Sequence, residues 1–152
     1  MTLRPGSGQA FSIRQTNWDT GRSQLASIRK AVFIEEQGVP PDLEWDGFDD
    51  ECVHVLAESQ NGEAVGCARL LPDGNIGRMA VLKDWRGKGV GSAILRSLLS
   101  AAAEEGMERV YVHAQTYVKK FYQQHGFKRI GDEFMEAGIP HVKMIKRLHE
   151  KV

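Results

Sequence analysis

The segment richest in chemistry is a glycine-rich run, RGKGVG, at residues 86–91. It lies between a predicted strand that ends near Leu82 and a predicted helix that begins near Val90. Glycine at alternate positions lets the backbone turn tightly and aim several N–H groups at one point, and the helix adds free N–H donors and the positive end of its dipole. Arg86 and Lys88 add positive charge, so the run predicts a cradle for an anion, although a tight turn without a ligand could use the same residues.

Two familiar phosphate-binding loops do not match this run. A P-loop needs Gly-Lys followed by Ser or Thr, and no Gly-Lys in this sequence is followed by either residue. A dinucleotide fingerprint needs Gly-x-Gly-x-x-Gly after the first strand of a βαβ unit, whereas here Gly-x-Gly-x-Gly follows a predicted three-strand meander. We therefore do not expect a nicotinamide cofactor.

A second motif, FYQQHGF at residues 121–127, lies about 30 residues further on, at the end of another predicted helix. The pattern Arg86-x-x-Gly89-x-Gly91 resembles the acyl-CoA pyrophosphate loop of the GNAT superfamily of N-acetyltransferases, and the second motif resembles that superfamily's Tyr-containing helix end. The two motifs occur in the family's order, and the resemblance covers residues 11–148. FIEEQ at residues 33–37 and GIPHVKM at residues 138–144 are similar to the ElaA-like group within the superfamily.

The resemblance implies that the chain uses acetyl-CoA as a cosubstrate. Backbone N–H groups of the glycine-rich run would bind the pyrophosphate, and a strand edge before it would pair with the pantetheine arm and polarise the thioester carbonyl. Tyr122 would be the general acid that protonates the departing sulfur, since a phenol with a pKa of about 10 stays protonated at neutral pH. Gln115 stands where many relatives have Asn. The implied cofactor contacts are Met79, Ala80, Val81, Arg86, Gly87, Lys88, Gly89, Val90, Gly91, Ser92 and Gln115.

An amine acceptor must lose a proton before it can attack, because an ammonium with a pKa of about 10.4 is only about one part in 2500 neutral at pH 7. Some family members carry a Glu on the pantetheine strand, but residues 75–82 contain no carboxylate. Glu36, His54 and His141 are the remaining candidates for a base or a substrate contact. We favour Glu36 as a substrate-facing acid, expect Arg69 to lie beside His54 and lower its pKa, and leave the base unassigned.

Two other interpretations stay open. In the first, Cys52 is a nucleophile assisted by His54, but side chains two residues apart on a strand are separated by about 6.5–7 Å, too far for a hydrogen bond. A zinc site built on the same pair lacks further ligands, and no metal is expected. In the second, the domain binds acyl-CoA without turnover, as a sensor or partner module.

The resemblance implies an α/β (α+β) fold with a central, mixed, mostly antiparallel, splayed sheet flanked by helices, and the predicted elements that must position these residues occur in the matching order. The hairpin register separates Cys52 from Cys67 by about four residues along the strands, so we expect no disulfide. The predicted elements are a strand at 11–14, a helix capped by Asp19 or Thr20 and ending near 37–38, a surface segment at 39–51 pinned by Trp45 and Phe48, a hairpin of 52–57 and 64–71 around a two-residue Asn61-Gly62 turn, a strand at 75–82, a helix from 90 to 106, a strand at 109–114, a helix at 117–125, and strands at 127–135 and 141–148.

Composition excludes several classes of protein. The 152 residues are 41% hydrophobic and 26% charged, with 20 basic and 20 acidic side chains, which predicts an ordinary globular domain without affinity for nucleic acid or an anionic membrane. No apolar run of about 18 residues and no signal peptide is present, so we expect a cytoplasmic protein. We expect a flexible N-terminus at 1–9, one acetyltransferase domain at 10–152 and a small-molecule or peptide amine as acceptor. The acidic segment 42–51 favours a cationic acceptor, and exposed strand edges leave a homodimer open.

Overall fold

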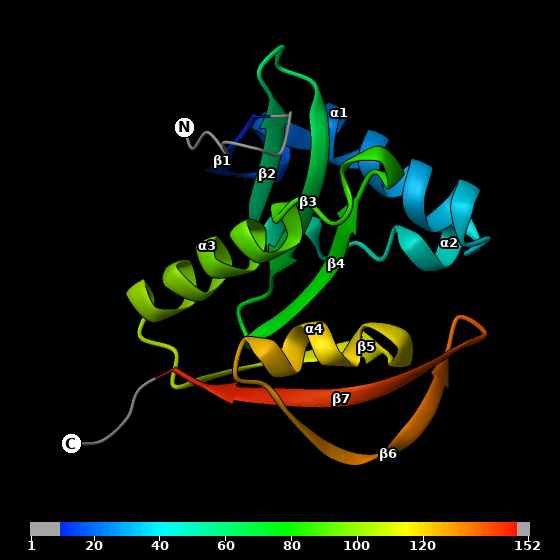
Figure 1. The fold of residues 1–152 in the computed structure, drawn as a ribbon, viewed down its shortest axis with the longest axis vertical. Coiled ribbons are helices and arrows are strands. Elements are labelled where there is room, and N and C mark those ends of the chain that lie inside the picture. Colours follow the sequence, from blue (N-terminus) through cyan, green and yellow to red (C-terminus); the bar gives the residue numbers. More distant parts are fainter. Residues whose placement is uncertain (1–9, 149–152) are drawn as a thin grey trace.

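The computed structural model describes residues 10–148, which form one mixed sheet with helices on both faces (Figure 1). Within these residues, seven strands are ordered β1-β2-β3-β4-β5-β7-β6, and every neighbouring pair is antiparallel except β4 and β5. The stretch 1–9, predicted to be flexible, lies outside the described residues. The elements are β1 (Phe11–Thr16), α1 (Trp18–Arg29), the π-helix η1 (Lys30–Glu36), α2 (Pro41–Glu44), η2 (Asp49–Glu51), β2 (Val53–Ser59), β3 (Ala64–Leu70), β4 (Asn75–Val81), η3 (Lys83–Trp85), α3 (Val90–Glu104), β5 (Arg109–Gln115), η4 (Thr116–Val118), α4 (Lys119–Gln124), β6 (Lys128–Glu136) and β7 (Ile139–Arg147).

The predicted order of strands and long helices is confirmed, but the cap of the first helix is not the predicted one. The side chain of Asn17 accepts a hydrogen bond from the Thr20 N–H at 2.9 Å, so Asn17 is the N-cap in place of Asp19 or Thr20. Capping needs extended backbone before the helix, and Asn17 has it at φ −123° and ψ 172°. The helix then continues beyond Arg29 as the π-helix η1, which the sequence pattern did not reveal.

The predicted hairpin register between β2 and β3 is confirmed, with Leu56 opposite Cys67. The loop differs from the prediction, because Ser59 pairs with Glu63 and leaves three loop residues, with Gly62 at φ 81°. A bulge at Ala57/Glu58 restores the register that a two-residue turn would have produced. Both cysteines are buried and free, as the register predicted.

Side chains at alternate positions of the strands point to opposite faces of the sheet, and a layer of helices covers each face. On one face, Val55, Val65 and Val112 pack with α3, and α4 lies along β5 in the same layer (Figure 1). On the other face, Leu56 and Cys67 pack with the apolar stripe of α1. This alternation follows from the two-residue period of a strand. Among residues 10–148, no helix has the length and hydrophobicity needed to cross a bilayer.

The parallel pair β4 and β5 comes apart soon after it begins, as the resemblance implied. The two strands pair only at Asn75 with Tyr111 and at Ile76 with Val112. Beyond these positions β5 continues to pair with β7, whereas β4 bends away with β3 (Figure 1). We call this diverging region of β4 and β5 the splay.

Buried ion pairs, and not burial of the two aromatic rings, hold the segment 39–51 in place. Trp45 and Phe48 are 37% and 48% exposed, which corrects the predicted role of their rings. Three carboxylates of this segment meet three arginines from α1, β3 and β4 within the described residues. The pairs are Arg29–Glu44 (2.7 Å), Arg29–Asp49 (2.7 Å), Arg69–Asp49 (2.9 Å), Arg69–Asp46, Arg78–Glu44 (3.1 Å) and Arg78–Asp46 (3.1 Å).

This set of six side chains, here called the arginine network, changes the interpretation of the acidic segment. Three positive and three negative charges cancel, so Glu44, Asp46 and Asp49 offer little net attraction to a cationic acceptor. Burial raises the pKa of Asp46, but hydrogen bonds from Arg69 and the backbone outweigh it and lower the pKa to about 2. Asp46 therefore stays ionised at neutral pH, and the arginine network stabilises the fold.

Candidate active site

The glycine-rich loop forms the predicted turn before α3. Gly87 and Gly89 have φ values of 74° and 86°, a left-handed conformation that glycine adopts without strain. Gly89 caps α3 with no side-chain hydrogen bond, and the first well-formed bond of the helix runs from the Ala93 N–H to the Gly89 carbonyl at 3.1 Å. Among the described residues, the N–H groups from Gly87 to Ser92 donate no hydrogen bond of good geometry. They remain available to an anion at the positive end of α3.

The two motifs that carry the resemblance meet in space. The His125 ring of the second motif hydrogen-bonds the Ser92 hydroxyl at 3.1 Å. A Cβ at Gly91 would touch the Phe121 ring at 3.5 Å, so the start of α3 packs closely on α4. The helix that carries Tyr122 therefore packs against the start of α3, where the loop predicted to bind the pyrophosphate ends.

The Arg86 guanidinium does not point to the place where the free N–H groups of the loop would hold an anion. It forms a two-pronged ion pair with Glu36, with N–O distances of 2.7 Å and 2.6 Å, and its Nε donates to the Val81 carbonyl at 2.9 Å. The hydrogen bond from Arg86 lowers the pKa of Glu36. Two predicted site residues thus meet, but they occupy each other, and Glu36 is a poor proton acceptor. Lys88 is left as the basic side chain of the loop.

The edge of β4 offers Met79 and Val81 to the splay. The Leu82 N–H donates to the Val65 carbonyl, and Ala80 pairs with Cys67 on β3. Because polar backbone groups alternate in direction along a strand, those of Met79 and Val81 point away from β3, toward β5. Ala80 instead turns its backbone to β3 and its side chain to α1, so it is not a backbone contact for a group in the splay.

A bulge at Arg78 marks the point where β4 turns from β5. Arg78 has a φ of 50°, which is unfavourable for a residue with a side chain. Its guanidinium donates to the carbonyls of Leu43 and Glu44 at 3.2 Å and 3.0 Å and joins the arginine network. These contacts hold the strained backbone, which no feature of the sequence indicated.

Tyr122 is 7% exposed on α4 and is clamped by aromatic rings. Phe121 and Phe127 contact it edge-to-face, at centroid distances of 5.1 Å and 5.5 Å. Burial raises the pKa of Tyr122 above its ordinary value, so the hydroxyl carries a proton at neutral pH. That state is the one a general acid requires.

Gln115 ends β5 and forms an amide pair with Gln37 at the end of η1. The Gln115 side chain donates to Gln37 at 3.0 Å, and Gln37 donates to the Tyr117 hydroxyl at 3.3 Å. Gln37 was part of the FIEEQ motif, but its side-chain role was not predicted. The pair links the helix after β1 to the strand on the far side of the splay.

His54 lies away from the splay, because β3 and β4 separate β2 from it. Its Nε2 bonds the Asp49 carbonyl at 2.9 Å, its ring packs on Trp18, and Arg69 lies opposite as predicted. Burial lowers the pKa of His54. His54 therefore supports the arginine network, and it cannot act as a base for a substrate held between β4 and β5.

Cys52 is not an activated nucleophile. Its thiol donates to the Phe48 carbonyl at 3.2 Å, and burial raises its pKa to about 11. His54 is engaged with Asp49, so neither partner of the proposed pair is free. The thiolate needed for covalent catalysis is therefore scarce at neutral pH.

His141 lies opposite Gln115, at the splay end of β7. Its Nδ1 bonds the Ile139 carbonyl at 2.6 Å, and its Nε2 is 3.8 Å from a Glu136 oxygen. The ring stacks on Phe134 and is 6% exposed. Glu136, His113 and Phe134 gather around it, and no motif in the sequence indicated this cluster.

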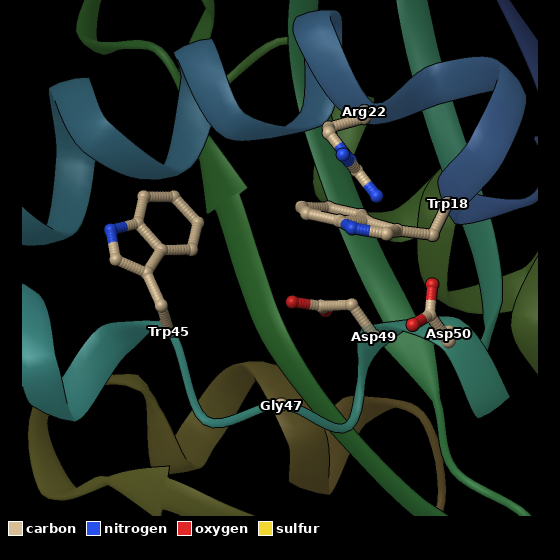
Figure 2. Close-up of a pocket in the computed structure, with 6 residues that line it drawn as sticks. All are labelled: Trp18, Arg22, Trp45, Gly47, Asp49 and Asp50. Atoms are coloured by element: carbon tan, nitrogen blue, oxygen red, sulfur yellow. The ribbon is translucent and has the colours of Figure 1, made fainter.

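A separate pocket of about 300 Å³ lies between α1 and the segment 45–50 (Figure 2). Arg29 stacks on the Trp45 ring at 4.9 Å, and Arg22 covers the other indole, of Trp18, at 5.5 Å. No predicted site residue lines it. The lining residues are Trp18, Arg22, Trp45, Gly47, Asp49 and Asp50.

The fold and the site define an N-acetyltransferase of the GNAT type, with a sheet opened between β4 and β5 and free N–H groups at the start of α3. The model of the acetyltransferase (GNAT) domain family matches residues 26–148, and the chain belongs to this family. The uncharacterised N-acetyltransferase YjcF of Bacillus subtilis is 39% identical over 124 residues, covering 78% of this chain and 87% of YjcF. The crystal structure of Escherichia coli ElaA is 29% identical with a TM-score of 0.79, covering 89% of this chain and 99% of ElaA.

A more distant structure shares the fold alone. It is an aminoglycoside 6'-N-acetyltransferase complexed with coenzyme A, which is 17% identical with a TM-score of 0.74. The match covers 93% of this chain and 99% of that chain.

Proposed function

We propose that the protein transfers an acetyl group from acetyl-CoA to a primary amine by direct attack within a ternary complex. The observation that carries the proposal is the set of free N–H groups from Gly87 to Ser92, beside a strand edge that faces the splay. The distant structural neighbour with bound coenzyme A supports the choice of cosubstrate. The acceptor is a small-molecule or peptide amine.

The chain's own groups would act in three places. The N–H groups of the loop, with Lys88, would hold the pyrophosphate. The backbone of Met79 and Val81 would pair with the pantetheine amides, and an N–H there would polarise the thioester carbonyl. Since Arg86 already occupies the Val81 carbonyl, the N–H of Val81 and the groups of Met79 remain for this role.

Tyr122 would supply the proton that the leaving sulfur needs. The amine nitrogen forms the C–N bond, the C–S bond breaks, and the sulfur leaves with the electron pair. Tyr122 gives its hydroxyl proton to the sulfur and recovers one from the nitrogen. Its raised pKa, caused by burial, keeps that proton in place until sulfur develops charge.

The experiment measures thiol release from acetyl-CoA with a panel of primary amines, together with mass spectrometry of the product. Tyr122→Phe is expected to lower kcat by about 10²–10⁴-fold while leaving the Kd for acetyl-CoA unchanged. An equal loss of affinity and turnover would remove Tyr122 from the role of acid. Tight acetyl-CoA binding with no turnover of any amine would instead favour a sensor or partner module.

A further inference from the structure

We propose that His113, oriented by Glu136, is the group that takes the proton from the acceptor amine, on the face of the splay opposite to α3 and α4. This proposal rests on the proposed function and names the base that the sequence left unassigned. The three residues His113, Glu136 and His141 are here called the His–Glu cluster.

The cluster lies where β5 has lost its neighbour. His113 directly follows Val112, the last residue of β5 that pairs with β4. Val110, Val112 and Ala114 are buried against the α3 layer, so His113 and Gln115 project from the other face of the strand. An amine bound there would approach the splay from the side opposite to the glycine-rich loop.

One carboxylate stands between two imidazoles. His113 Nδ1 is 3.2 Å from one Glu136 oxygen, and His141 Nε2 is 3.8 Å from the other. Phe134 packs on both rings, edge-on against His113 at 5.2 Å and stacked on His141 at 5.8 Å. Within residues 10–148 no group of three His, Cys, Asp or Glu side chains is arranged to hold a metal ion.

The hydrogen bonds define which nitrogen is free. An ionised carboxylate only accepts, so His113 Nδ1 carries the hydrogen and donates it to Glu136. The neutral ring then has its lone pair on Nε2, as in a carboxylate–histidine pair that activates a nucleophile. The His113 side chain is 40% exposed and His141 is buried, so His113 is the ring that a substrate can reach. His113 is thus the proton acceptor and Glu136 is its positioning residue, while His141 lies beside the second oxygen of Glu136.

The groups around Glu136 favour its ionised form. The hydrogen bond from His113 lowers the pKa of Glu136, burial opposes this, and the charges of His113, His141 and Arg78 lower it further. Arg78 belongs to the bulge of β4, so Glu136 lies within electrostatic reach of the strand that would hold the thioester. The ionised Glu136 also attracts an acceptor that arrives as a protonated primary amine.

The proton balance closes with these groups. The ammonium of the acceptor gives one proton to His113 Nε2 and becomes a neutral amine. The amine nitrogen bonds to the acetyl carbon as the C–S bond breaks, and its second proton replaces the one that Tyr122 gives to the sulfur. The amide keeps the third hydrogen, and His113 releases its proton to solvent.

The test compares His113→Gln with the wild-type chain and with Glu133→Gln, which removes an exposed carboxylate on the same strand as Glu136. His113→Gln is expected to lower kcat/KM for a basic amine by about 10²–10⁴-fold and to leave the Kd for acetyl-CoA unchanged. Glu136→Gln is expected to lower kcat/KM by a smaller factor, and Glu133→Gln is expected to change kcat/KM less than about threefold. Circular dichroism checks that each variant is folded.

Two readouts separate a proton acceptor from a structural residue. The loss caused by His113→Gln should shrink for weakly basic amines, which are already neutral at pH 7, and the acid limb of kcat/KM against pH should disappear. The titratable and charged groups around His113 are Glu136 on β6, Lys143 on β7 and Tyr111 on β5 with its partner Asp73. His141 on β7 and Arg78 on β4 act on Glu136.

The outcomes distinguish this proposal from the proposed function. If the wild-type chain acetylates amines while His113→Gln keeps its rate within about threefold and retains the acid limb, the base assignment is overturned and the proposed function stands. A uniform loss across amines of all basicities also overturns it. If the wild-type chain binds no acetyl-CoA and acetylates no amine, the proposed function fails first.

Discussion

Asp49 is the carboxylate that joins two arms of the arginine network. Its Oδ1 accepts from Arg29 at 2.7 Å and from Arg69 at 2.9 Å, and its side chain is only 7% exposed. Asp49→Asn keeps the shape of the side chain but leaves three arginines facing two carboxylates. The amide group also presents N–H donors to guanidinium groups that are themselves donors.

The expected cost follows from burial. Removing one partner of a buried ion pair destabilises a protein by about 3–5 kcal/mol, because the remaining charge is left uncompensated. A domain of this size has an unfolding free energy of about 5–15 kcal/mol. With a urea m-value of about 2 kcal/mol/M, the unfolding midpoint should fall by about 2 M.

The assay is equilibrium unfolding in urea at neutral pH, followed by tryptophan fluorescence. Asp50→Asn is the matched control, because Asp50 is the adjacent carboxylate, is exposed and makes no ion pair within the described residues. The control should stay within about 0.5 kcal/mol of wild type. A loss below about 1 kcal/mol for Asp49→Asn, or a loss equal to that of the control, would refute the idea that buried charge pairing holds this segment.

Three further outcomes follow from the geometry. Glu36→Gln should change kcat less than about threefold at saturating amine, because Glu36 is occupied by Arg86 and is not the base; a loss of 10²-fold in steady-state rate would contradict this. Asp46 has a pKa lowered to about 2, below the unfolded value of about 3.9, so its stabilisation is present above that value and is lost as pH falls. The unfolding free energy, measured from pH 5 to pH 2, should decline, and the decline should be shallower in Asp46→Asn. Arg78→Ala should be about 1 kcal/mol less stable in urea than Arg78→Gly, since only glycine relieves the φ of 50°; equal stabilities would argue against strain.

The sequence predicted what depends on local periodicity. The order of strands along the chain follows from the two-residue period, and the apolar stripe of α3 follows from the 3.6-residue period. Both are confirmed. The two motifs pointed to the loop before α3 and to Tyr122, which the fold brings together through Ser92 and His125. The register of the β2–β3 hairpin was correct because the bulge and the longer loop compensate each other.

Contacts between distant elements could not be predicted. The acidic segment 42–51 was interpreted as favouring a cationic acceptor, but three of its carboxylates pair with arginines from α1, β3 and β4. Glu36 and Arg86 are separated by 50 residues, and only the fold shows that they neutralise each other. The His–Glu cluster likewise combines β5, β6 and β7, so its members do not share a motif.

Calorimetric titration of the purified chain with acetyl-CoA tests the central claim most directly. ATP and NADH serve as ligand controls, and Gly89→Asp, which places a carboxylate in the N–H cradle at φ 86°, serves as the protein control. We expect one-to-one binding in the micromolar range for acetyl-CoA with the wild-type chain, and no heat with the ligand controls or with Gly89→Asp. Absence of acetyl-CoA binding at several hundred micromolar, or unchanged affinity in Gly89→Asp, would contradict the assignment of this loop and of the cosubstrate.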